Sequence, residues 1–80
     1  MGIYEATVQR IRDLCEKQKI TPNALSYRSG ISQATVKSIL LGESKNPGIV
    51  TIKKICDGFE ITICEFFNDD LFHKLEQEIK

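Results

Sequence analysis

Two short helical segments follow one another between residues 21 and 42, and each has its own start and stop signal. The first begins at Thr21-Pro22, an N-cap residue followed by proline at the first helical position, and ends at Gly30. The second begins at Ser32 and ends at Gly42, with apolar residues again at helical spacing. Each segment is about two turns long and is too short to be stable alone in water. Neighbouring helices must therefore hold the pair in place.

Helical periodicity continues on both sides of this pair, and no strand pattern interrupts it. Apolar residues repeat every three or four positions over about 4–19, 49–59 and 63–67, and the turn-forming stretch 42–48 predicts a surface loop. A further short helix is expected near the C-terminus, with one apolar side made of Leu71, Phe72, Leu75 and Ile79. The sequence thus predicts an all-α fold, with a five-helix domain over 1–68 and 69–80 as its C-terminal helical extension.

The length of 80 residues allows one domain with one core. An apolar fraction of 41% and a charged fraction of 28% are those of an ordinary soluble domain. No apolar run approaches the roughly 18 residues that a membrane span needs, and the N-terminus lacks the apolar stretch of a signal peptide. These features predict a cytoplasmic protein with no membrane partner.

The residue types that carry catalysis and metal binding are sparse. Cys15, Cys56 and Cys64 form no CxxC pair and lie within apolar helical patterns, so we expect buried, inert thiols with no metal and no disulfide. His73 is the sole histidine and is expected at the surface. No glycine-rich phosphate loop or recognisable catalytic pair is present, which argues against an enzyme and against a bound cofactor.

Charge is distributed unevenly along a chain whose formal net charge is zero. Residues 1–54 carry nine Lys or Arg against four acidic residues, a net charge of +5, and residues 55–80 carry the opposite excess of −5. One half can therefore face phosphate while the other is repelled by it. The alternative is that both halves are ordinary solvated helix faces.

The pattern of the paired helices and their flanks resembles the Cro and phage-repressor type (XRE-like) of helix-turn-helix domain over residues 4–67. The motifs are Thr21-x-x-x-Leu25-Ser26-x-x-x-Gly30-Ile31-Ser32, Val36-x-x-Ile39-Leu40-x-Gly42, Pro47, Thr51-Ile52-x-Lys54-Ile55-Cys56, and Ile61-Thr62-x-x-Glu65-Phe66-Phe67. The resemblance implies a five-helix domain that binds double-stranded DNA as a transcriptional regulator, most often a repressor. Ser26 and Ser29 depart from the family, which usually has alanine there, and their hydroxyls need partners.

The resemblance implies that the exposed N-terminal face of helix 32–41 reads base edges in the major groove. The residues at these positions are Gln33, Ala34, Thr35, Lys37 and Ser38. Gln can pair with adenine, Lys can donate to guanine, and Ala can touch a thymine methyl. The alternative is an ordinary polar helix face.

Phosphate contacts are expected from the groups that flank this helix, since helix N-termini and loop donors bind phosphate oxygens. The expected residues are Thr21, Asn23, Ser44, Lys45 and Asn46. Whether Lys53 or Lys54 contacts phosphate stays open, because only one face of their helix can approach the duplex. Glu43 departs from the basic residue that is common in the family's loop, and should weaken phosphate binding locally.

Family members bind operators as dimers, which implies a homodimer whose recognition helices lie about 34 Å apart. The residues Phe67, Leu71, Phe72, Leu75 and Ile79 form a candidate dimer surface, although closing the core is the alternative role for this stripe.

A rival to the regulator is an antitoxin-like or other protein-binding helical module, whose acidic half engages a protein partner.

Overall fold

The computed structural model describes residues 1–79, in which five α-helices and one 3-10 turn alternate with short connections. The helices are α1 (Ile3–Gln18), α2 (Pro22–Ser29), α3 (Gln33–Leu41), α4 (Ile49–Phe59) and α5 (Ile63–Phe67), and the 3-10 turn is η1 (Asp70–Phe72). No strand occurs within these residues. The predicted all-α, five-helix fold is confirmed. Within the described chain, no helix has the length and apolar character needed to cross a membrane.

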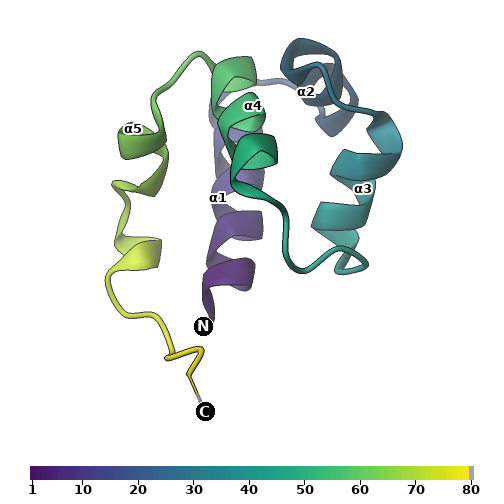
Figure 1. Cartoon of the computed structure of the whole chain (residues 1–80). Helices are drawn as coiled ribbons and strands as arrows, with labels where there is room; N and C mark the ends of the chain where they lie inside the picture. Colours follow the sequence, from purple (N-terminus) through teal and green to yellow (C-terminus); the bar gives the residue numbers. More distant parts are fainter. Residues whose placement is uncertain (80) are drawn as a thin grey trace.

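The other three helices pack around α1 and α4, which lie in the middle of the molecule (Figure 1). The pair α2 and α3 lies on one side of these two helices, and α5 with the C-terminal segment lies on the other. The fully buried side chains come from every helix and include Ile11, Leu25, Ile39, Ile55, Phe59 and Phe66. Neither α2 nor α3 has a core of its own, and both are held by this shared one.

The helix ends follow the capping signals of the sequence at most places. The hydroxyl of Thr21 accepts from Ala24 N–H at 3.1 Å, and that of Ser32 accepts from Thr35 N–H at 3.0 Å. Gly30 and Gly42 close α2 and α3 with φ of 68° and 85°, in the left-handed region that costs glycine little. Thr62 and Glu65 form a capping box at the start of α5.

The prediction of a C-terminal helix that includes Leu75 and Ile79 is wrong, because the chain forms only the 3-10 turn η1 there. Asp69 caps that turn by accepting from Leu71 N–H at 3.0 Å, and residues 75–79 then run without helical structure. The backbone N–H of Glu76 donates to Met1 O at 3.1 Å, and the Glu76 carboxylate lies 3.2 Å from the N-terminal ammonium. A short helix needs an apolar face packed on its neighbours, and Ile79 is 85% exposed.

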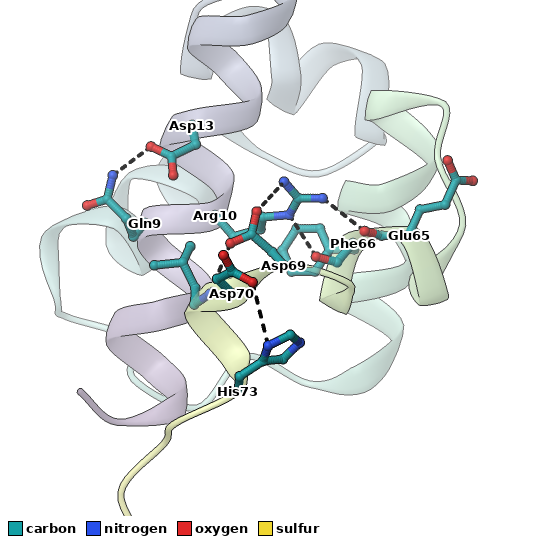
Figure 2. Close-up of polar contacts among 9 residues, drawn as sticks. Gln9, Arg10, Asp13, Glu65, Phe66, Asp69, Asp70 and His73 are labelled. Carbon is teal, nitrogen blue, oxygen red and sulfur yellow. Dashed lines mark hydrogen bonds and ion pairs between the residues drawn. The ribbon is translucent and has the colours of Figure 1, made fainter.

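Arg10 joins α1 to the end of α5 (Figure 2). Its Nε donates to Phe66 O at 2.7 Å and its Nη2 to Glu65 O at 2.9 Å, while Nη1 lies 3.2 Å from the Asp69 carboxylate. The guanidinium also lies 5.9 Å from the centre of the Phe66 ring. One of the basic residues of the N-terminal half is therefore used for packing.

The cysteines were predicted to be buried, and this is correct for two of the three. Cys15 and Cys56 lie in the core, where burial raises the pKa of both thiols. Cys64 is exposed, which corrects the prediction: it lies in the first turn of α5, and the helix's buried side is occupied by Phe66. His73 is at the surface as expected, 3.5 Å from the Asp70 carboxylate.

Candidate nucleic-acid interface

The two short helices meet at Gly30 and bury one side each. On α2 the buried residues are Leu25, Ser26 and Ser29, and on α3 they are Val36 and Ile39. The opposite side of α3 is exposed along its first turns. The helix pair therefore presents α3 to the surroundings while α2 lies between α3 and α4.

All five residues expected to read bases lie on the outer side of α3, though not in equivalent surroundings. Gln33, Ala34, Thr35 and Lys37 are exposed, and Ser38 is half-buried. The Thr35 hydroxyl lies 2.8 Å from that of Ser32 and so takes part in the cap. The Gln33 and Lys37 side chains form no hydrogen bond within residues 1–79, and they can extend from the helix toward a ligand.

Ser38 is the base-reading candidate with an acidic neighbour. Its hydroxyl donates to the Glu43 carboxylate at 3.5 Å, a long contact for a hydrogen bond. Glu43 thereby stands close to the C-terminal half of the exposed face of α3. Because negative charge repels phosphate, weaker phosphate binding beside Glu43 stays a prediction.

Two hollows flank α3 and bring several of the expected residues together. The larger, about 550 Å³, lies on the α2 side, and the smaller, about 270 Å³, lies on the side of the α3–α4 loop. The larger hollow is lined by Arg12, Pro22, Asn23, Gln33, Ala34, Val36, Lys37, Leu40 and Leu41. The smaller is lined by Ala34, Thr35, Ser38 and Ser44. Neither lining includes an acidic residue. The larger hollow has Arg12 and Lys37 in its lining, which suits it to an anion, whereas Ser38 of the smaller hollow contacts the Glu43 carboxylate.

The remaining phosphate candidates do not line these hollows. Thr21 is exposed at the start of α2 and uses its hydroxyl as the N-cap. Lys45 and Asn46 are exposed in the α3–α4 loop, where they line a separate hollow of about 150 Å³ beside the first turns of α1. The structure thus groups Asn23 and Ser44 with α3 and sets Lys45 and Asn46 farther along the loop.

Lys53 and Lys54 differ in their surroundings, although both are exposed on α4. The Lys53 ammonium forms an ion pair with the Asp57 carboxylate one turn later. Lys54 forms no ion pair within the described residues. A phosphate contact by Lys53 would have to compete with Asp57.

Two residues of α1 that sequence reasoning did not assign to the site bind the end of α3. Tyr4 Oη donates to Ile39 O, and Arg12 Nη2 donates to Leu40 O at 3.1 Å. Carbonyls at a helix C-terminus have no intrahelical partner, so these donors satisfy them. The sequence offered a weak signal, since Tyr4 continues the predicted buried stripe of α1 one turn before Val8, and Arg12 directly follows Ile11 of that stripe.

The candidate dimer surface is mixed in its exposure. Phe67, Leu71, Phe72 and Leu75 are half-buried, and Ile79 is largely exposed. Phe67 packs edge to face on both Phe66 and Phe72, with ring centres 4.9 Å apart in each pair. Much of this stripe therefore closes the core, and its outer edges stay accessible.

Comparison with known proteins settles the family. The model of the Cro/C1-type HTH DNA-binding domain matches residues 10–70, which is most of the chain and includes α2, α3 and both hollows. The chain belongs to the Cro/C1-type helix-turn-helix family. This confirms the resemblance drawn from the motifs and identifies the chain as a helix-turn-helix DNA-binding domain. The family is one of DNA-binding regulators and not of enzymes.

The Cro/C1-type domain is similar to two further proteins. An uncharacterised HTH-type transcriptional regulator, RghRB of Bacillus subtilis (strain 168), is 43% identical over 47 residues, which make up 59% of this chain and 34% of that protein. The chain thus spans about a third of the length of this curated relative. The crystal structure of the prophage Lp1 protein 11 has a TM-score of 0.79 and 29% identity, and the match covers 94% of this chain and all of that one. The antitoxin-like or protein-binding alternative is not favoured by these likenesses.

Proposed function

We propose that this Cro/C1-type domain binds a specific operator as a transcriptional repressor, with α3 in the major groove. The exposed polar face of α3 between two hollows without acidic lining carries this proposal. The major groove of B-DNA is wide enough for one helix, and the two strands of the duplex then pass on either side of it. We expect the two strands to pass over the two hollows.

Within this arrangement, the first turns of α3 read the bases. Gln33 can accept and donate to one adenine, Lys37 can donate to guanine, and Ala34 can touch a thymine methyl. Thr35 and Ser38 are closer to the protein's own polar groups, because Ser32 and Glu43 contact their hydroxyls. Gln33 and Lys37 therefore carry most of the discrimination.

The phosphates are held by groups on both sides of α3. Thr21 and Asn23 at the start of α2 serve one strand, and Ser44, Lys45 and Asn46 in the loop serve the other. Phosphate contacts fix the position of α3 in the groove but carry no sequence information. Of the two lysines on α4, Lys54 is better placed to add a contact, since Lys53 is paired with Asp57.

Affinity and specificity increase further if two copies bind together. We infer a homodimer with two α3 helices about 34 Å apart, on half-sites related by a two-fold axis. The accessible edges of Phe67, Leu71, Phe72, Leu75 and Ile79 are the proposed contact. Catalysis forms no part of this function, and the DNA ligand fits the cytoplasmic localisation predicted from the sequence.

The first experiment selects bound duplexes from a random pool and then compares variants on the selected operator and on random DNA. Gln33→Ala should lower operator affinity by roughly tenfold, as expected for a lost bidentate base contact, and leave random DNA nearly unaffected. The control is Gln9→Ala, the same change on an exposed position of α1. Equal losses on both DNAs would refute base readout by Gln33.

A second measurement tests the phosphate contacts and the dimer. Lys45→Gln should weaken binding to all sequences alike and lower the slope of log Kobs against log salt by about 0.9. Lys17→Gln, an equal charge change on α1, serves as control. A selected motif without two-fold symmetry, together with monomeric sedimentation on DNA, would contradict the homodimer.

A further inference from the structure

Arg12 extends from α1 into the larger of the two hollows beside α3. Its Nη2 donates to Leu40 O at the end of α3, and Arg12 lines the hollow together with Asn23 and Lys37. Arg12 is exposed, and this is the hydrogen bond that it forms within residues 1–79. A guanidinium has five N–H donors, so most of them stay available to a ligand.

The lining of this hollow has the chemistry of an anion site. Arg12 and Lys37 bring two positive charges to it from different helices, and its lining has no carboxylate to neutralise them. Arg10 shows the contrast, because the same residue type two positions earlier is paired with Asp69 and two backbone carbonyls. The charge of Arg10 is therefore paired within the fold, whereas the charge of Arg12 stays available to a ligand.

We propose that Arg12 binds a phosphate of the DNA backbone in this hollow, which makes α1 a third element of the DNA interface. The inference rests on the proposed function, in which α3 lies in the major groove. One strand then passes over the hollow between α3 and the start of α2. The planar guanidinium fork matches two oxygens of a phosphodiester, and a charge-assisted contact of this kind is stronger than one made by a neutral donor.

In this proposal the Arg12 side chain has two roles, since it binds the C-terminal end of α3 and also binds the phosphate. Because Arg12 binds Leu40 O, the anchored phosphate has a fixed separation from the C-terminal end of α3. Arg12 thereby sets how far α3 enters the groove, whereas a phosphate contact from the α3–α4 loop, such as that of Lys45, does not.

The test measures binding of the full chain to the operator and to a random duplex at several salt concentrations. Arg12→Gln should weaken both by roughly tenfold at 0.1 M salt and lower the salt slope by about 0.9. The matched control is Arg28→Gln, which removes the same charge from an exposed position of α2 outside both hollows. Its salt slope should stay at the wild-type value.

The salt slope separates a phosphate contact from a structural role. If Arg12 only closes the end of α3, Arg12→Gln weakens binding while the slope stays unchanged, and this result overturns the proposal. If the wild-type protein itself shows no salt-dependent DNA binding, the proposed function fails instead.

A second measurement keeps the folded wild-type protein and changes the DNA. Neutral methylphosphonates are placed one at a time along each strand of the operator. The phosphate held by Arg12 should be the position where neutralisation weakens the wild-type protein but has no further effect on Arg12→Gln or Arg12→Ala, whichever of these neutral variants folds. Equal sensitivity of wild type and variant at every position contradicts the contact.

Discussion

Ser29 on α2 lies directly against Gly58 on α4. A Cβ added to Gly58 would clash with Ser29 Oγ and would lie 3.2 Å from both Ser29 N and Leu25 Cδ1. Glycine at position 58 lets α2 approach α4 closely, and this approach fixes the helix-turn-helix pair on the rest of the domain. The helix continues through Gly58 to Phe59, although glycine has a low helix propensity.

Gly58→Ala should destabilise the domain despite the better helix propensity of alanine. Overpacking costs about 1–3 kcal/mol, and the propensity gain of about 1 kcal/mol offsets part of it. Urea unfolding should show a lower free energy of unfolding by about 1 kcal/mol. Gly58→Ala combined with Ser29→Ala is the contrast and should recover part of the loss, because it removes the hydroxyl that lies closest to the new Cβ. A Gly58→Ala protein that is more stable than wild type would show that α2 shifts away from α4 at little cost.

Ser29→Ala should stabilise the protein. The Ser29 hydroxyl is buried and has no hydrogen-bond partner within residues 1–79, so it bears a desolvation cost of about 1 kcal/mol. Ser26→Ala is the contrast, since the Ser26 hydroxyl donates to Asn23 O at 2.7 Å and its loss should be neutral or slightly destabilising. Thermal and urea unfolding of both variants give the comparison. A Ser29→Ala protein that is less stable than wild type excludes this account.

Arg10→Lys should destabilise the junction of α1 with α5. Lysine keeps the charge but cannot reproduce the fork that reaches Phe66 O, Glu65 O and Asp69 together. With hydrogen bonds to charged groups contributing about 1.5–3 kcal/mol, we expect a loss of about 2 kcal/mol in urea unfolding. Lys17→Arg, at an exposed position of α1, controls for the exchange of cations. Wild-type stability in Arg10→Lys would mean that the charge alone matters.

Tyr4→Phe should loosen the end of α3. Removing the hydroxyl leaves Ile39 O without its donor from α1, at a cost of about 1 kcal/mol. The backbone N–H groups of Glu43 and Ser44, which both donate to Ser38 O, should then exchange faster with solvent. Tyr27→Phe is the control, because Tyr27 is 91% exposed. Unchanged exchange at Glu43 and Ser44 would contradict the role of Tyr4.

One of the three thiols should react quickly with a thiol reagent in the folded protein. Burial raises the pKa of Cys15 and Cys56, so at a given pH their reactive thiolate fraction is lowered, and raising the pH increases it. Cys64 is exposed and should react first. A time course near pH 8 should show one fast equivalent, three after unfolding, and none that is fast in Cys64→Ser. Three fast equivalents in the native protein would show that the core opens readily.

Local signals in the sequence determined most of the helix boundaries and the face of α3 that carries Gln33 and Lys37. Thr21, Ser32 and Thr62 cap helices, and Gly30 and Gly42 end them, because capping and left-handed backbone depend on residues a few positions apart. The recurring apolar spacing then fixed which sides are buried. A family resemblance followed from the order of these signals.

Tertiary contacts decided the features that no local pattern encodes. Lys19 and Glu60 end helices with φ of 57° and 59°, although glycine is the usual residue there, because the following chain is drawn back to the core. The C-terminal stripe has helical spacing, yet the chain leaves η1 and runs to Met1. Arg10 and Arg12 are the same residue type two positions apart on α1, but Arg10 binds the end of α5 and Arg12 binds the end of α3. Their roles depend on which distant helix lies beside them, and that is set by packing.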